Sequence, residues 1–313
     1  MTLKLGNITT IVISSPQLAK EVLHKNDLIS SYRAVPDTLR ALDHNLYSVG
    51  WMQPSNEWRI LRRICATKVF SSQQLDSTQV LRQKKVEELM DFVKKRSEKG
   101  EALDIGEVAF ITVLLVAGVE TTSITIEWVM AELLRNPEKL EKVRNELQHV
   151  IGKNEQLEEK HISKLPFLKA VVKETFRLHP PAPLLVPHKS QENVELCGFI
   201  VPKNAQVWVN VWAMGRDSSI WTNPNEFMPE RFLESEIDFQ GHDFELIPFG
   251  AGKRMCPGLP LAYRAVHILL ASLLHCYDWK LPNEDKEEEL DMSENFGLTL
   301  RKAQSLKAIP IQS

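Results

Sequence analysis

The first residues of the chain alternate between apolar and polar side chains. In the stretch TLKLGNITTIVISS, residues 2–15, alternation on both sides of Gly6-Asn7 predicts a β-hairpin that turns at this pair. Ser15 followed by Pro16 is a helix start signal, so a short helix is expected over PQLAKEVLHKN. Helical periodicity returns from Asn56 to about Glu98, with an interruption near residues 70–72.

Three further helices are predicted in the middle of the chain. The first begins near Ile111 and runs through TTSITIEWVMAELLRN, and Pro137 begins the second, PEKLEKVRNELQHVIG. The third covers KLPFLKAVVKETFRLH, with Ser163 as its predicted N-cap and Pro180-Pro181 as its end.

The last third of the chain mixes strands with one long apolar helix. Short strands are predicted between residues 184 and 213, where VELCGFIVP and AQVWVNVWAM are rich in β-favouring residues. A long apolar helix is expected after Gly258, followed by an acidic, solvated loop at 283–291 and a terminal hairpin around FGLTL. The pattern as a whole predicts a mainly α protein with small β-sheets.

Composition narrows the class of protein. The 313 residues are 43% hydrophobic and 25% charged, as in ordinary globular proteins, and a net charge of -3 argues against a nucleic-acid binder. Four scattered cysteines favour reduced thiols and a chain that faces the cytosol over a disulfide scaffold or structural zinc site. With no apolar run of about 18 residues and no signal-peptide pattern, a soluble chain is expected.

Candidate chemistry lies in FGAGKRMCPG, residues 249–258. A cysteine between apolar segments is most often a small buried hydrophobe. Here, however, glycines permit a tight loop, Lys253 and Arg254 add positive charge, and the loop leads into a predicted helix N-terminus. These features stabilise a thiolate at Cys256, which can be a nucleophile or a metal ligand. A nucleotide-binding loop is excluded, because Arg254 stands where serine or threonine is needed.

The same stretch resembles the haem-binding signature F-x-x-G-x-R-x-C-x-G of the cytochrome P450 monooxygenases. The matching residues are Phe249, Gly252, Arg254, Cys256 and Gly258. The resemblance implies the cytochrome P450 fold, haem b as cofactor, and Cys256 as the axial ligand of the haem iron. It also implies electrons from NADPH, which a partner reductase binds and passes on.

The segment AGVETT, residues 117–122, stands where this family has its oxygen-activating motif. Without the resemblance it is a polar notch in a buried helix, whose threonines bond back to the preceding turn. The resemblance implies that Ala117 and Gly118 border the oxygen pocket and that Glu120 and Thr121 relay protons.

Two further motifs follow the family pattern. Glu174 and Arg177 of ETFR resemble two members of a buried structural triad, whose third member is Arg231 of NPNEFMPERF. As an ordinary surface pair the first two would contribute only about 0.2–0.5 kcal/mol. In WRILR, the alternative to a binding role is a plain amphipathic face, but the resemblance implies that Trp58 and Arg62 contact a haem propionate. Further propionate contacts are expected from Arg254 and His188.

The chain most resembles plant enzymes of the membrane-bound class, within them the geraniol hydroxylase group, and it departs from them in two places. Compared with these enzymes, we expect that a membrane anchor before the first strand is missing, and that an internal segment between Phe110 and Ile111, which carries the helices covering the substrate pocket, is missing too. We therefore expect one truncated domain over 1–313. Residues 1–110 form its N-terminal part, and 111–313 carry the oxygen-activation helix, the triad and the haem loop.

Two functions of different class are predicted. In one, the chain inserts an oxygen atom from O2 into a small lipophilic substrate, such as a monoterpenoid. The resemblance then places it on the cytosolic face of the endoplasmic reticulum membrane, or in soluble or peripheral form if no anchor is present. In the other, the chain is a non-catalytic fragment or splice product with impaired or no haem binding.

Overall fold

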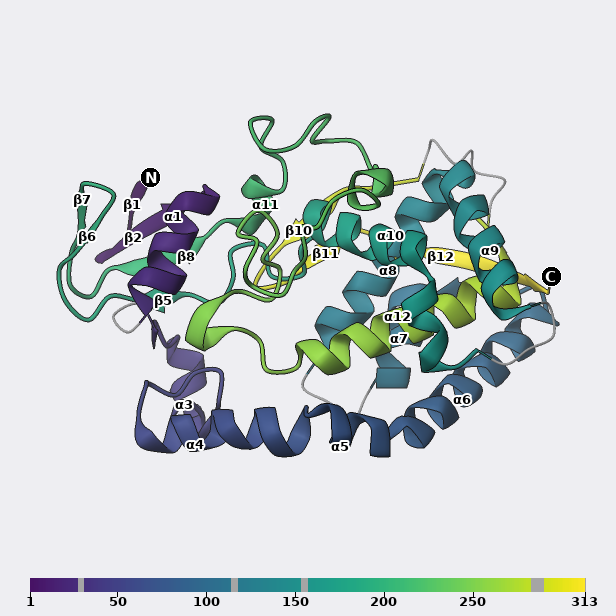
Figure 1. Ribbon diagram of the computed structural model, residues 1–313, viewed down its shortest axis with the longest axis horizontal. Helices are drawn as coiled ribbons and strands as arrows, with labels where there is room; N and C mark the ends of the chain where they lie inside the picture. The colour runs from purple at the N-terminus through teal and green to yellow at the C-terminus, as the bar shows by residue number, and fades with distance from the viewer. Residues whose placement is uncertain (28–30, 114–117, 153–156, 283–289, 313) are drawn as a thin grey trace. The chain divides into compact units, whose positions relative to one another are not determined.

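The computed structural model describes residues 1–27, 31–113, 118–152, 157–282 and 290–312 (Figure 1). The chain forms two compact units. Unit 1 comprises Met1–Ser71, Ala182–Glu226 and Ile237–Pro257, and unit 2 comprises Ser72–Pro181, Phe227–Glu236 and Gly258–Ser313. The predicted division at residues 110 and 111 lies inside unit 2, within one helix.

Unit 1 is built on a five-stranded sheet in the order β1-β2-β8-β5-β3. Its strands are β1 (Thr2–Leu5), β2 (Ile8–Ile13), β3 (Tyr32–Arg33), β5 (His188–Lys189) and β8 (Gln206–Val209). Leu5 pairs with Ile8 across an antiparallel turn, which confirms the predicted hairpin. β2 and β8 are parallel, so residues far apart in the sequence share the sheet core.

Short helices and a second hairpin complete unit 1. They are α1 (Pro16–Lys20) with the π turn Glu21–Lys25, the 3-10 segment Asp37–Asp43, α3 (His44–Tyr47), α4 (Asn56–Ile64) with the π turn Cys65–Val69, the hairpin of β6 (Val194–Leu196) and β7 (Phe199–Val201), and α11 (Val211–Met214). The Ser15 hydroxyl caps α1 as predicted. The strand predicted through Val211–Met214 is wrong, because the Asn210 carboxamide accepts from the Ala213 amide and starts a helical turn.

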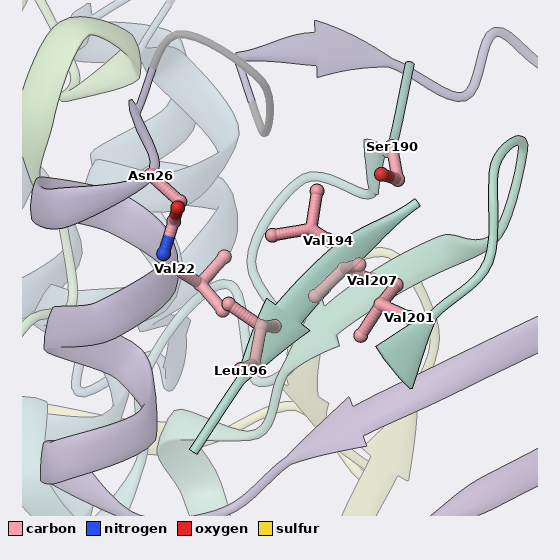
Figure 2. Close-up of a pocket in the computed structure, with 7 residues that line it drawn as sticks. All are labelled: Val22, Asn26, Ser190, Val194, Leu196, Val201 and Val207. Carbon is pink, nitrogen blue, oxygen red and sulfur yellow. The ribbon is translucent and has the colours of Figure 1, made fainter. Parts of the chain in front are cut away.

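A small pocket lies between the β6–β7 hairpin, β8 and the π turn Glu21–Lys25 (Figure 2). It holds about 10 Å³, roughly the space of one water molecule. Its lining is mostly valine and leucine, with the polar atoms of Asn26 and Ser190 at the edge. It is a packing gap of the core, too small for an organic ligand.

Unit 2 is helical, with two small sheets. Its helices are α5 (Ser72–Ser77), α6 (Gln79–Ser97), α7 (Ile105–Val113), α8 (Val119–Arg135), α9 (Pro137–Ile151), α10 (Pro166–Leu178) and α12 (Leu259–Cys276), with 3-10 turns at Glu159–Lys164 and Pro229–Phe232. The sheets pair β4 (Leu103–Asp104), β12 (Lys307–Gln312) and β9 (Tyr277–Lys280), and β10 (Glu294–Phe296) with β11 (Leu300–Lys302). α12 packs against α6, α8, α9 and α10 (Figure 1).

Two helix predictions in unit 2 need correction. The single helix expected from Ile111 to Asn136 is two helices, α7 and α8, which pack against each other. Ser163 does not cap α10, because it lies in the preceding 3-10 turn and donates to Lys160 O. The first amides of α10 instead donate to the Glu146 carboxylate of α9, at 2.7 Å from Phe167 and 2.9 Å from Leu168.

α12 differs from the expectation that no segment is apolar enough to span a membrane. Among the described residues it is the helix that is long and apolar enough to cross a bilayer, by length and composition alone. Its second half, from Val266 to Leu274, is buried in unit 2. A buried core helix passes the same test, so α12 is weak evidence for a membrane span.

Candidate functional site

The cysteine loop is held by its own backbone. The Cys256 amide donates to Phe249 O at 2.9 Å, and the Met255 amide donates to Gly252 O at 3.1 Å, which closes a 3-10 turn over Gly252–Arg254. The Phe249 ring packs against Phe239 with centroids 5.6 Å apart. Cys256 is exposed, and all four cysteines lie in the described part of the chain, where they form no disulfide. Gly258 is the N-cap of α12, as the sequence predicts.

Gly252 has to be glycine for two independent reasons. Its φ of +65° lies in the left-handed region, and an added Cβ would stand 2.0 Å from Leu23 O. The neighbouring Lys253 amide donates to the Asp27 carboxylate at 3.1 Å, so the turn lies directly on the segment that follows α1. Burial raises the pKa of this Asp27 carboxyl, although Lys253 opposes the effect.

We expect Gly252→Ala to destabilise the chain far more than Gly250→Ala. Both glycines have positive φ, so both variants pay a conformational cost of about 1–2 kcal/mol. Only at Gly252 does the new methyl group also meet a backbone oxygen, whereas at Gly250 the nearest atom is a Leu185 methyl at 3.9 Å. Urea unfolding midpoints measure the difference. Equal losses in the two variants would contradict the close approach to Leu23.

Arg254 is buried next to Trp58. Its guanidinium carbon lies 4.2 Å from the ring centroid of Trp58, a cation–π contact. Its Nε donates to Ser31 O and its Nη2 to Met52 O, both at 2.6 Å. The Trp58 indole in turn donates to Val49 O at 3.0 Å. The tryptophan and arginine of two separate motifs therefore meet.

Arg62 and Arg33 bring two more positive charges to Arg254. Arg62 stands one turn beyond Trp58 on α4, with its guanidinium carbon 6.0 Å from the ring centroid. Burial and then Arg254 and Arg62 lower the pKa of Arg33 to about 9, and burial and then Arg62 lower the pKa of Arg254 to about 10. Burial also lowers the pKa of Arg62, while the nearby thiols of Cys65 and Cys256 oppose this. The three guanidinium groups repel one another.

This arginine cluster, Arg33, Arg62 and Arg254, fits a ligand with more than one negative charge. Within the described ranges no carboxylate forms an ion pair with any of the three. Burying like charges together is costly unless an anion compensates them. Guanidinium groups bind carboxylates well, so the two propionates of haem match the cluster in charge and chemistry. The residues present therefore fit the cofactor that the family implies.

The sequence contains no signal that distinguishes Arg33. Its side chain is 6% exposed and donates to Val186 O at 2.7 Å and to Gly50 O at 3.1 Å. These carbonyls lie far from it in the sequence. Arg33 also stands opposite His188 in the pairing of β3 with β5. His188, which is buried, thus joins the neighbourhood of the cluster through the sheet.

The oxygen-activation motif lies in unit 2, at the start of α8. Gly118 is the N-cap, and the Thr121 hydroxyl donates to its carbonyl at 3.2 Å, the local bond expected of a threonine in a helix. Glu120 Oε1 accepts from Thr299 Oγ1 at 2.6 Å and from Arg301 of β11. These hydrogen bonds, that from Thr299 above all, lower the pKa of Glu120. Ala117, the remaining predicted residue, lies outside the described residues.

The three residues of the predicted triad are in contact, also in unit 2. Arg177 donates through Nε and Nη2 to the two oxygens of Glu174, each at 2.7 Å. Arg231 Nε donates to Glu174 Oε1 at 3.1 Å, and the Met228 amide donates to the same oxygen at 2.7 Å. Glu174 and Arg177 are fully buried, so this is no surface pair. The triad ties α10 to the 3-10 turn Pro229–Phe232.

A mainly α fold with a glycine-rich cysteine loop and an arginine cluster fits the class of proteins that bind haem through a cysteine. The cytochrome P450 family model matches residues 1–113 and 107–307. The chain therefore belongs to the cytochrome P450 family and is an oxidoreductase of that class. This confirms the family and the fold class that the sequence predicts.

Curated plant proteins are similar over almost the whole chain. Cytochrome P450 76T24 of Catharanthus roseus is 40% identical, over 100% of this chain and 86% of its own length. Geraniol 8-hydroxylases of Catharanthus roseus and Swertia mussotii are 38% and 37% identical, over 99% of this chain and 86% of their own lengths. The chain thus resembles plant cytochromes P450, including geraniol 8-hydroxylases.

Solved structures share the fold. A zebrafish cytochrome P450 with progesterone superimposes with a TM-score of 0.88 at 22% identity, over 100% of this chain and 96% of that chain. The alignment with cytochrome P450 76T24 spans 430 residues, more than the 313 of this chain, so the relative carries residues that this chain lacks. The family match is likewise in two parts that meet at residues 107–113.

Proposed function

We propose that the chain binds haem b through the Cys256 thiolate and inserts one oxygen atom from O2 into a small lipophilic substrate. The observation that carries the proposal is the arginine cluster beside the cysteine loop in unit 1. It provides buried positive charge for a dianionic ligand, and Arg62 is close enough to Cys256 for the thiolate to act on its charge. When bound, haem supplies the one-electron and dioxygen chemistry that side chains lack.

The side chains of unit 1 hold and orient the cofactor in this proposal. Arg62 and Arg254, with His188, bind the propionates, and Trp58 supports Arg254 from its ring face. The turn at Gly252 and the ring of Phe249 shape the loop, so that the thiolate is presented at a defined position. Gly258 begins α12 directly after it.

The side chains of unit 2 handle protons and stability. Thr121 and Glu120 relay protons to the oxygen pocket, which Gly118 borders. Glu174, Arg177 and Arg231 stabilise the fold around α10. An acid and a hydroxyl at adjacent positions suit a short proton path through water. The carboxylate accepts hydrogen bonds, and the hydroxyl both donates and accepts them.

The proposed substrate is a monoterpenoid alcohol such as geraniol. The support is the similarity to the two geraniol 8-hydroxylases. A NADPH-cytochrome reductase is the proposed electron donor. The proposed location is the cytosolic face of the endoplasmic reticulum membrane.

A second candidate function is a non-catalytic chain. The two-part family match favours it, because the two parts overlap at residues 107–113, inside α7. Phe110 of this helix is 44% exposed, as expected if a partner segment present in relatives does not cover it. A chain without helices over the haem would admit water, which favours loss of reduced oxygen over substrate oxidation.

The test is co-expression with a plant NADPH-cytochrome reductase, followed by a carbon monoxide difference spectrum and turnover with geraniol. A thiolate-type Soret band and an NADPH-dependent hydroxylated product are expected. Haem-loaded chain that consumes NADPH but yields only hydrogen peroxide, or chain without haem, would support the second candidate. A larger lipophile of steroid size serves as the control for substrate class.

A further inference from the structure

The hydrogen bonds of Glu120 converge on one of its two oxygens. Oε1 accepts from the Thr299 hydroxyl at 2.6 Å, from Arg301 Nε at 3.1 Å, and from Arg301 Nη2. Among contacts between described residues, no donor reaches the other oxygen, Oε2. The side chain is 44% exposed. One oxygen of the carboxylate is therefore held by protein, and the other is available to water.

Both donors come from the hairpin of β10 and β11, which is itself fixed on α8. The Trp128 indole lies about two turns beyond Glu120 on α8. It donates to Leu300 O at 3.1 Å in a buried hydrogen bond. Lys302 Nζ lies 4.9 Å from the Trp128 ring centroid. Leu300 stands between Thr299 and Arg301, so its bond to Trp128 sets where the two donors meet Glu120.

The neighbouring Thr121 has a complementary arrangement. Its hydroxyl proton is used on Gly118 O, which leaves the lone pairs of Oγ1 as acceptors. Within the part of the chain that the structure describes, the two side chains do not bond each other, and each keeps an acceptor that no described donor occupies. A water molecule at either acceptor can donate to it and pass a proton along.

We propose that Arg301 and Thr299 are positioning residues, which hold Glu120 by Oε1 and leave Oε2 open to exchange protons with water. This rests on the proposed role of Glu120 and Thr121 in the oxygenation reaction. The step is a proton relay alone: Oε2 accepts a proton from solvent and releases it to the next water molecule of the path. Glu120 returns to the carboxylate, and no electron is transferred.

The lowered pKa of Glu120 agrees with this geometry. A carboxylate with a depressed pKa stays ionised over the working pH range, so it relays protons without storing them. Removing Arg301 raises this pKa, and the low-pH limb of coupled turnover then moves to higher pH. The sign follows because a depressed pKa keeps the carboxylate charged until the pH falls through it.

The experiment compares Arg301→Gln and Thr299→Val with Arg135→Gln. The control removes the same charge at the other end of α8, where the side chain is exposed. The first readout is the pH titration of the Glu120 carboxyl carbon by NMR, assigned by its loss in Glu120→Gln. We expect the midpoint to rise in Arg301→Gln and Thr299→Val and to stay unchanged in Arg135→Gln.

The second readout is product formed per NADPH consumed, measured against pH. We expect a several-fold fall in the first two variants with NADPH consumption maintained, steepest at low pH, and partial rescue in Arg301→Lys. An unchanged Glu120 midpoint in Arg301→Gln, or equal coupling in that variant and Arg135→Gln, would overturn the proposal. The titration needs no turnover, so an inactive chain with a shifted midpoint would overturn only the proposed function.

Discussion

Cys256→Ser is expected to abolish the thiolate-type carbon monoxide spectrum completely. A serine hydroxyl does not ionise near neutral pH, so it cannot replace the thiolate as a charged, electron-donating ligand. The loop itself is expected to survive, because it is held by backbone bonds such as the one from the Cys256 amide to Phe249 O. The variant should therefore fold with a cooperative urea transition like that of the parent chain.

Cys197→Ser is the matched control, since Cys197 is also exposed in unit 1 but lies between β6 and β7. It should retain the full thiolate band and haem content. A thiolate band that persists in Cys256→Ser, or disappears in Cys197→Ser, would assign the ligand to another cysteine. The pyridine haemochrome assay measures haem content, and urea unfolding measures whether the variant is folded. Together they separate loss of ligation from loss of fold.

Glu174→Gln is expected to destabilise the chain by about 3–5 kcal/mol, because it leaves two buried guanidinium groups without their carboxylate. The free energy of unfolding of a typical domain is only about 5–15 kcal/mol, so this loss is a large share of the total stability. The amide is neutral and keeps one accepting oxygen, which replaces the Oε1 that accepts from Arg177, Arg231 and the Met228 amide. Its NH2 group would replace Oε2, where a donor would face the Nε–H donor of Arg177.

The control for Glu174→Gln is Glu138→Gln, which removes the same charge from an exposed pair with Lys139. It should leave the urea midpoint nearly unchanged. The double variant Glu174→Gln, Arg177→Gln should lose less free energy of unfolding than the two single variants together, since the two residues share one interaction. Additive losses, or a small loss in Glu174→Gln, would show that the triad contributes little to the fold.

Elements with a strong local pattern could be predicted from the sequence. The β1–β2 hairpin, the start of α1 at Pro16 and the start of α9 at Pro137 all follow from turn and proline chemistry within a few residues. The haem-loop motif and the ETFR motif can likewise be recognised, because each consists of fixed residue types at short spacings. In ETFR, Glu174 and Arg177 are three residues apart, which places them on one face of α10.

Elements that depend on distant partners could not be predicted. α10 starts on the Glu146 carboxylate of α9, so its N-cap could not be found among the residues before it. The strand pattern over Val211–Met214 gave way to a helical turn once Asn210 capped it. α7 and α8 are separate helices that pack against each other, and periodicity alone did not distinguish them from one helix.

By itself the sequence determined the family, and it predicted the cysteine ligand and the triad, because fixed residue types at motif spacings encode them. Only the tertiary structure decided that Arg33 joins Arg62 and Arg254, and that Arg301 and Thr299 hold Glu120. The physical reason is that charge repulsion and hydrogen bonding act across space. Their partners are separated by more than a hundred residues in the case of Glu120, and no local pattern records them.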